Sequence, residues 1–159
     1  MNTFQPQVEQ LESRVTPTTA SMVGGILVVY GTDGADDILV TKNTNGSYSV
    51  SGVSGTFGGV SQVRVYGQAG DDRIEVAENI TISTYLYGWA GDDTLVGGSG
   101  HDFLYGNDGD DTLMGRGGND YMNGWSGNDT FVGGVGFDTA VDFSGEHQSH
   151  DGVERFIYY

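Results

Sequence analysis

The sequence predicts an all-β fold, a parallel β-solenoid with an irregular β-rich N-terminal part and a short C-terminal capping strand. Three observations lead to this prediction. Six consecutive nine-residue units run from Gly88 to Val141. After Met22 no segment shows sustained 3.6-residue periodicity, so little or no helix is expected. Short β-prone runs alternate instead with loops rich in Gly and Asp.

The composition limits both fold and function. The chain has 159 residues, a length that fits one domain, with 28 Gly and no Cys. Its 22 acidic and 6 basic residues give a formal net charge of −16 at pH 7, which argues against nucleic acid as a partner because phosphate binding needs a Lys/Arg surface. No apolar run approaches the roughly 18 residues of a membrane span, so no membrane insertion is expected. The absence of Cys excludes disulfides and thiolate metal sites.

Residues 1–21 differ from the rest of the chain, because they contain both prolines and no Gly, and we expect them to form a flexible tail. Residues 22–87 form a degenerate β-rich part that we expect to share one domain with the units. A turn over Asn43–Ser47, with Asn45-Gly46 supplying positive φ angles, is expected to close a hairpin. The strands expected in this part are Ile26–Tyr30, Ile38–Thr41, Tyr48–Val50, Val60–Tyr66, Arg73–Val76 and Ile80–Tyr87.

The six units over residues 88–141 read GWAGDDTLV, GGSGHDFLY, GNDGDDTLM, GRGGNDYMN, GWSGNDTFV and GGVGFDTAV. Positions 1 and 4 are Gly, position 6 is Asp and position 8 is apolar in all six, a regularity that composition alone does not produce. The position-4 glycines are Gly91, Gly100, Gly109, Gly118, Gly127 and Gly136. The position-6 aspartates are Asp93, Asp102, Asp111, Asp120, Asp129 and Asp138. The position-8 residues are Leu95, Leu104, Leu113, Met122, Phe131 and Ala140.

Two copies of the same pattern lie upstream, at Gly31–Ile38 and Gly67–Ile74. They are 36 residues apart, which is four units, but the next step, to Gly88, is 21 residues and breaks the register. Asp72 is therefore a candidate site residue outside the six. Whether Asp36 and Asp72 bind an ion is left open.

The pattern has a direct geometric consequence. Glycine at positions 1 and 4 lets the backbone turn sharply and exposes carbonyl oxygens that a side chain would crowd. The last three positions form one short strand whose middle residue points inward. A six-residue loop and a three-residue strand make half a coil, so two units complete one turn and equivalent residues stack about 4.8 Å apart. Asp93, Asp111 and Asp129 then fall in one column, and Asp102, Asp120 and Asp138 in the other.

Stacked carboxylates at this spacing repel each other by about 1 kcal/mol per pair in water, and by about 3.5 kcal/mol at an effective dielectric constant of 20. A bound cation would relieve this repulsion. Because the candidate ligands are all oxygens, with no Cys and no paired His, a hard cation is favoured, Ca²⁺ before Mg²⁺. The alternative is a solvated acidic turn face with no bound ion.

The units resemble the GGxGxDxUx nonapeptide of the RTX family, the hemolysin-type calcium-binding repeat, closely over residues 88–141 and loosely over 31–74. The resemblance implies a right-handed parallel β-roll in which each Ca²⁺ lies between loops two units apart, bound by Asp carboxylates and by carbonyls near positions 2 to 4. At least four ions are then expected, between the pairs Asp93/Asp111, Asp102/Asp120, Asp111/Asp129 and Asp120/Asp138. Position 2 departs from the family's glycine at Trp89, Asn107, Arg116 and Trp125, where a β-carbon makes the loop conformation costlier.

Outside the repeats, a seventh unit decays after Asp142, with His147 where Asp belongs, and residues 142–159 are expected to cap the roll. His101 and His150 are expected to be exposed, without a metal or catalytic role.

Aromatic side chains are expected to mark the surface. Phe103, Tyr105 and Tyr121 form a patch that either packs under the C-terminal strand or contacts a protein or glycan. Trp89 and Trp125 share one loop column and are placed to stack on a partner.

These features predict a secreted or cell-surface bacterial protein that binds Ca²⁺, needs Ca²⁺ to fold, and has a structural, adhesive or matrix role without enzymatic activity. No Ser/His/Asp or paired-Glu arrangement stands out. Self-association driven by Ca²⁺ is also expected, because bound ions reduce the repulsion between acidic chains. The alternative is a calcium-dependent folding and secretion module of a larger enzyme or toxin exported by type I secretion.

Overall fold

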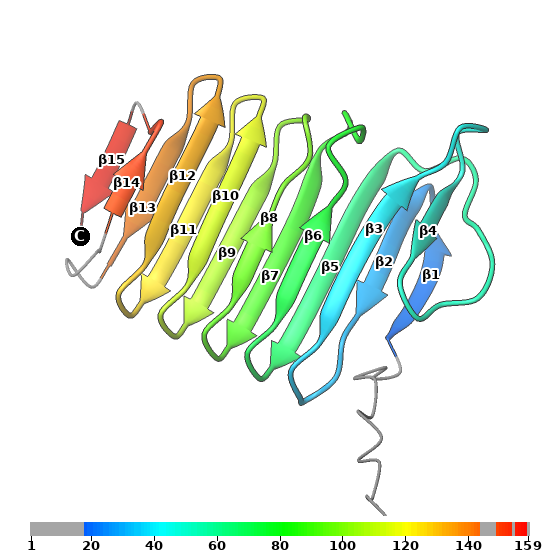
Figure 1. The fold of residues 1–159 in the computed structure, drawn as a ribbon, viewed down its shortest axis with the longest axis horizontal. Helices are drawn as coiled ribbons and strands as arrows, with labels where there is room; N and C mark the ends of the chain where they lie inside the picture. The colour runs from blue at the N-terminus through cyan, green and yellow to red at the C-terminus, as the bar shows by residue number, and fades with distance from the viewer. Residues whose placement is uncertain (1–17, 144–148, 154, 159) are drawn as a thin grey trace, which may run out of the picture.

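The structure is a computed structural model that describes residues 18–143, 149–153 and 155–158. These residues are all-β and wind into a solenoid of stacked coils, which confirms the predicted fold class (Figure 1). The described part of the chain has no helix that could cross a membrane. The strands are β1 (Thr19–Val23), β2 (Ile26–Tyr30), β3 (Asp37–Lys42), β4 (Tyr48–Val50), β5 (Gln62–Ala69), β6 (Arg73–Val76), β7 (Thr84–Ala90), β8 (Thr94–Val96), β9 (Phe103–Asp108), β10 (Thr112–Gly117), β11 (Tyr121–Ser126), β12 (Thr130–Val135), β13 (Thr139–Asp142), β14 (Ser149–Asp151) and β15 (Arg155–Tyr158).

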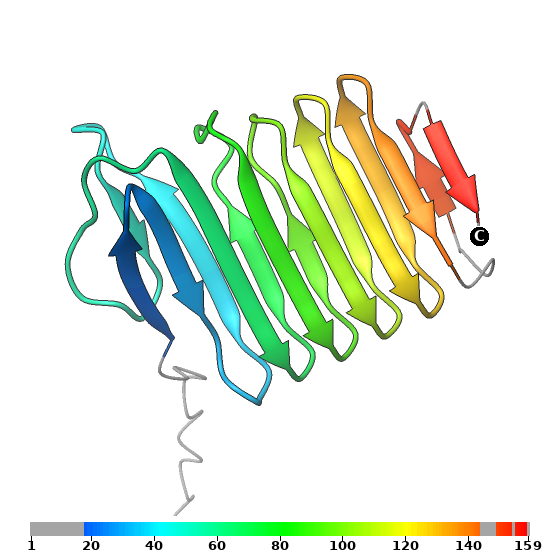
Figure 2. The same cartoon turned by 180° about the vertical axis from the view of Figure 1, so that it is seen from behind.

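The strands form two sheets, and successive coils add one strand to each (Figures 1 and 2). One sheet has the order β1-β2-β5-β7-β9-β11-β13-β15, and the other has the order β14-β12-β10-β8-β6-β3-β4. Within the repeats all pairings are parallel and 18 residues apart: Thr112 lies between Thr94 and Thr130, and Phe103 lies beside Tyr121. Two nine-residue units therefore complete one turn, as the sequence predicted.

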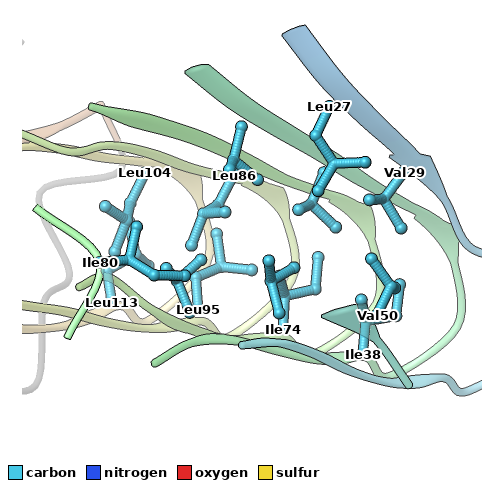
Figure 3. Close-up of a cluster of buried hydrophobic side chains, with 14 of the residues drawn as sticks. Leu27, Val29, Ile38, Val50, Ile74, Ile80, Leu86, Leu95, Leu104 and Leu113 are labelled. Carbon is cyan, nitrogen blue, oxygen red and sulfur yellow. The ribbon is translucent and has the colours of Figure 1, made fainter. Parts of the chain in front are cut away.

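The hydrophobic core lies between the two sheets (Figure 3). Each repeat strand buries its position-8 residue there, and all six of these side chains are fully buried. The next inward position along such a strand is a glycine, as in β9, where Leu104 and Gly106 are both buried. Strands β2 to β6 of the degenerate part bury two apolar side chains each instead, Leu27 and Val29 in β2 for example. The core is therefore wide near the N-terminal end and narrow through the repeats.

The N-terminal end of the eight-stranded sheet is covered by β1, which pairs antiparallel with β2 so that Thr19 lies opposite Tyr30. The boundary expected at residue 21 is wrong in this respect, because residues 19–21 belong to a strand. The open edge of β2 exposes unpaired backbone groups, and β1 satisfies them. The flexible tail expected for residues 1–17 lies outside the described residues.

Three of the expected strands, β2, β4 and β6, have the predicted bounds, whereas β7 begins at Thr84 and not at Ile80. Ile80 is fully buried but lies in a turn, in which its N–H donates to the carbonyl of Ala77 over 2.9 Å. Its apolar character therefore reflects packing of a loop against the core. For β5, expected from Val60, the first residue is Gln62.

The expected hairpin joins β3 and β4, which pair antiparallel. The N–H of Asn43 donates to the carbonyl of Ser47 over 2.8 Å, and Gly46 has a φ of +83°. Positive φ was expected at Asn45 as well, but Gly46 alone adopts it; the side-chain oxygen of Asn45 accepts the N–H of Ser47 over 3.0 Å. This side-chain bond holds the turn without the second left-handed residue.

The 21-residue step before the repeats does not break the solenoid. Arg73 in β6 pairs with Thr94 in β8, 21 residues later, and Gln68 pairs with Trp89 across the same step. The three extra residues lie in the loop over 77–83, at the opposite edge of the coil from the loop that carries Asp72. The register of the two sheets is therefore continuous from the upstream copies into the repeats.

At the C-terminal end, β14 and β15 extend the two sheets by one parallel strand each, so the expected capping strand is present. Phe156 of β15 lies beside Ala140 of β13. Because β15 continues the sheet at its end, it does not cover the aromatic patch on β9 and β11, whose side chains remain half-buried. His147 lies outside the described residues.

Replacement of Gly118 by Ala is expected to destabilise the protein by about 3 kcal/mol. Gly118 has a φ of +115°, and a β-carbon there would lie 1.9 Å from the carbonyl oxygen of Gly100 one coil away. The neighbouring Gly117 is the matched control, because a β-carbon there would meet no atom closer than 3.7 Å. Urea unfolding in the presence of Ca²⁺ measures the difference. Equal losses for Gly117→Ala and Gly118→Ala would show that the coils are not packed through position 4.

Candidate metal centre

The position-6 aspartates form two columns, one along each edge of the solenoid. In each column the backbone N–H of one aspartate donates to Oδ1 of the aspartate in the next coil. One column runs through Asp36, Asp72, Asp93, Asp111 and Asp129, with N–H to Oδ1 distances of 2.8, 2.7, 2.8 and 2.9 Å. The other runs through Asp102, Asp120 and Asp138, with distances of 2.8 Å for both steps.

Each carboxylate turns inward, over the position-1 glycine of its own loop. A β-carbon built on Gly106 would fall 2.0 Å from Oδ2 of Asp111, and one on Gly88 would fall 2.1 Å from Oδ2 of Asp93. The glycine thus makes room for the carboxylate at the edge of the core. All six position-6 aspartates are buried, none with more than 3% of its surface exposed.

The second oxygen of most of these carboxylates has no hydrogen-bond donor. Oδ2 is buried without a partner in four aspartates of the repeats and in Asp72 upstream; the four are Asp93, Asp111, Asp120 and Asp129. A buried carboxylate oxygen without a partner is costly, and the cost recurs here in four of the six repeat units. Such an arrangement calls for a positive charge between the loops.

Burial raises the pKa of these carboxyl groups far above the usual 3.8, to about 7 for Asp93 and Asp120 and to about 8 for Asp111. The second cause is the negative charge of neighbouring aspartates in the column, and the N–H bond to Oδ1 opposes both. The pKa values of Asp72 and Asp129 are each raised to about 6 for the same reason, burial first. At neutral pH the bare columns therefore resist the ionised state that a cation would stabilise.

The oxygen atoms available as metal ligands fit a hard cation. Besides the Oδ2 atoms, each loop offers the carbonyl of its position-4 glycine, which is directed at the position-4 glycine of the next coil; the glycines so stacked include Gly91 under Gly109 and Gly109 under Gly127. In the described residues no three His, Asp or Glu side chains converge, and the oxygens that could hold an ion here are those of paired carboxylates and of the backbone. Oxygen ligands from flexible loops suit Ca²⁺. His101 is exposed, as expected, and its Nδ1 accepts the N–H of Asn119 over 2.7 Å.

The structure places Asp72, and also Asp36, in line with the repeat aspartates. Asp72 donates its N–H to Asp93 and accepts that of Asp36, and Oδ1 of Asp36 is buried without a partner. The register break that set Asp72 apart is absent from this edge of the coil. Ion binding by Asp36 and Asp72 stays a prediction. Both residues have the same hydrogen-bond geometry as the repeat aspartates of their column.

Asp102 differs from the other repeat aspartates. Its Oδ1 accepts both the N–H and the hydroxyl of Thr84, and its Oδ2 accepts the N–H of Gly98 over 2.7 Å. Thr84 occupies the place of an aspartate in the preceding coil, so the second column begins with a neutral residue. Asp102 is thus the candidate ligand whose oxygens are already hydrogen-bonded.

Sequence reasoning missed a second ladder, formed by position 5. The side chain of Asp71 accepts the N–H of Asp92 over 3.1 Å. In the same way, the side chain of Asp92 accepts the N–H of Asp110 over 2.9 Å, and that of Asp110 accepts the N–H of Asn128 over 2.8 Å. The signal was present, because position 5 holds Asp, Asn or His in five of the six units. These exposed residues tie successive loops together outside the buried columns.

Without a bound cation, the fold is expected to be more stable in mild acid than at neutral pH. The folded chain holds protons on Asp93 and Asp111 up to about pH 7 and 8, whereas the unfolded chain releases them near 3.8. Stability from these groups is therefore complete below the unfolded value and is lost as the pH rises through the folded values. Thermal unfolding of the chelated protein, followed by circular dichroism, should give a higher Tm at about pH 5 than at about pH 8. A Tm that rises with pH in chelator would contradict the raised pKa values of the buried aspartate columns.

Comparison with known proteins agrees with this geometry. Residues 85–104 and 105–140 match the family model of the RTX calcium-binding nonapeptide repeat, in 4 copies. The match covers the six units to their last residue but one and leaves both upstream copies outside. Comparisons with curated proteins and with solved structures find no match.

Proposed function

We propose that this chain, whose residues 85–140 carry RTX calcium-binding repeats, is a secreted or cell-surface β-roll that Ca²⁺ folds and stiffens, with a structural or adhesive role. The observation that carries the proposal is the set of buried Oδ2 atoms without partners, each held over a glycine. Outside cells Ca²⁺ is abundant, and sites of modest affinity made from flexible loops are filled there. The protein then acts as a binding and structural module and not as an enzyme.

Calorimetric titration with Ca²⁺ tests the proposal. At least four ions per chain are expected, one for each of the pairs Asp93/Asp111, Asp102/Asp120, Asp111/Asp129 and Asp120/Asp138. Titration with Mg²⁺ under the same conditions is the control, and it should give weaker binding because Mg²⁺ demands near-octahedral geometry and keeps its water. Fewer than two Ca²⁺ ions per chain would overturn the proposal.

A surface role is supported by the aromatic ladder on the outer face of the eight-stranded sheet. Tyr30, Tyr66, Tyr87 and Tyr105 stack in one row, with ring centroids 5.1, 4.9 and 5.0 Å apart. A second row beside it contains Tyr85 and Phe103, whose centroids are 4.6 Å apart. The stacked, partly exposed rings offer an aromatic contact surface on an acidic protein.

Self-association through this ladder is expected when Ca²⁺ is present. Four bound ions would offset half of the net charge of −16 and so lower the repulsion between two chains. Light scattering should report monomers in chelator and larger species at millimolar Ca²⁺, with Tyr105→Ser reducing the association. Deletion of residues 1–17 tests separately whether they contribute to the association. Monomers under all conditions would reject self-association and leave the aromatic ladder as a surface for contacts with other molecules.

A further inference from the structure

The chain has two tryptophans, and both lie in one row of the solenoid. Trp89 in β7 pairs with Asn107 in β9, and Asn107 pairs with Trp125 in β11. All three residues occupy position 2 of their units, at the edge where each strand runs into its loop. The two indole side chains are 55% and 50% exposed, which is high for residues of this size.

The backbone at both tryptophans is in a conformation that favours glycine. Trp89 has a φ of +83° and Trp125 a φ of +73°. A left-handed backbone costs a residue with a β-carbon about 1–2 kcal/mol, and bulky residues rarely adopt it. Position 2 is glycine in two other units, at Gly98 and Gly134. Gln68 and Asn107 in the same row also have positive φ angles, of +91° and +81°, and Arg116 in the other row has one of +71°. Side chains kept at positions that favour glycine all along this row point to a function of the side chains themselves.

A cavity of 240 Å³ lies between the two tryptophans, and its other walls are Ala90, Asn107 and Asp108. Since Trp89 and Trp125 are two coils apart, their backbones are about 9.6 Å from each other. One flat ring held between two aromatic side chains needs about 7–8 Å between their planes, at ordinary carbon–carbon contact distances. Phe143 packs against the indole of Trp125, with centroids 5.1 Å apart, and so supports that wall.

The same combination occurs on the other side of Trp89. A second cavity, of 310 Å³, is lined by Trp89, Gln68, Ala69 and Asp33. Each cavity thus joins an indole wall to one amide and one carboxylate. Because Gln68, Trp89, Asn107 and Trp125 lie in successive coils of one row, the two cavities follow each other along the axis of the solenoid.

We propose that this row binds a neutral polysaccharide, with one pyranose ring between Trp89 and Trp125 and a further ring against the other face of Trp89. An amide both donates and accepts hydrogen bonds and a carboxylate accepts them, which matches sugar hydroxyl groups that do both. The indole faces cover the apolar C–H faces of the ring. A net charge of −16 disfavours an anionic polymer. The site deepens the proposed adhesive function and rests on it, because Ca²⁺ must hold the coils in place.

Intrinsic fluorescence tests the proposal directly, since the only two tryptophans of the chain line the cavity. The folded protein in Ca²⁺ is titrated with cellohexaose, maltohexaose, mannohexaose and chitohexaose. At least one of them should produce a saturable change in tryptophan emission. Trp89→Gly and Trp125→Gly should each weaken its binding at least about tenfold, read from the remaining tryptophan and by calorimetry. Both substitutions relieve the strained backbone, so the variants are expected to fold.

Phe137→Ala is the matched control, because Phe137 is also an exposed aromatic loop residue, 59% exposed, and lies outside this row. Its affinity for the oligosaccharide should equal that of the unmodified chain. No saturable response to any of the four oligosaccharides, or an equal loss in Phe137→Ala, would overturn the proposal. So would a response to tetramethylammonium alone, which would make the cavity a cation site. Ca²⁺ titration of the same samples separates the two proposals: normal Ca²⁺ binding without a saccharide response rejects the saccharide site alone.

Discussion

Removal of Ca²⁺ at neutral pH is expected to unfold residues 88–141. Each repeat strand places one apolar side chain in the core between the sheets, and the next inward place holds a carboxylate over a glycine. The narrow core of the repeats must therefore offset the burial of a carboxyl group in every half-coil. Four ions that bind only the folded state contribute about 2.7 kcal/mol each at a hundredfold excess over Kd, about 11 kcal/mol in total. A domain of this size has about 5–15 kcal/mol of stability, so the ions account for most of it.

The degenerate part should respond less. Its strands β2 to β6 bury two apolar residues each, as Val63 and Val65 do in β5, and β3 and β4 form a closed hairpin. Far-UV circular dichroism in excess chelator should therefore lose much but not all of the β signal. Hydrogen exchange should locate the loss in residues 88–141. A spectrum unchanged by chelator, with full protection of the repeat amides, would contradict the calcium-dependent fold.

Asp111→Ala is expected to cost two ions and about 5 kcal/mol, whereas Asp138→Ala should cost one ion and about half as much. Asp111 lies between Asp93 and Asp129 in its column and serves the loops on both sides. Asp138 follows Asp120 and serves one of the four pairs. Asp120→Ala should resemble Asp111→Ala, because Asp120 is also central.

The neighbouring Asp110 supplies a matched control. Its exposed carboxylate accepts the N–H of Asn128 over 2.8 Å but lies outside the buried column, so Asp110→Ala should keep every ion and cost about 1 kcal/mol. Calcium calorimetry and urea unfolding of the variants measure both quantities. Equal ion losses in Asp111→Ala and Asp138→Ala would reject shared ligands between successive sites.

Most of the fold could be predicted from the sequence because the repeat pattern itself determines the loop and the strand of each half-coil. Glycine at positions 1 and 4 and one apolar residue at position 8 allow a six-residue loop, a three-residue strand and little else. The columns of Asp93 and Asp102 follow from an 18-residue turn. The core residues follow as well, since position 8 is the inward member of each strand.

The remainder depended on contacts that no local pattern reveals. The 21-residue step was expected to disturb Asp72, but a loop can absorb three residues at one edge and leave the other edge in register. Thr84 takes the place of an aspartate at the start of one column. This cannot be recognised in the sequence until the position of the irregular loop around Ile80 in the coil is known. The inward turn of each carboxylate over glycine is likewise a tertiary feature, because it needs the next coil to supply the N–H that holds Oδ1.

Anomalous X-ray diffraction from crystals grown with Ca²⁺ would show whether Ca²⁺ lies between the buried aspartates of successive coils. A peak is expected at each of the pairs Asp93/Asp111, Asp102/Asp120, Asp111/Asp129 and Asp120/Asp138, with carboxylate oxygens about 2.3–2.6 Å from the ion. Further peaks at Asp72/Asp93 and Asp36/Asp72 would extend the column to the upstream copies. Well-ordered loops whose aspartates stay buried over their glycines, with no anomalous peak between them at millimolar Ca²⁺, would contradict calcium binding between the coils.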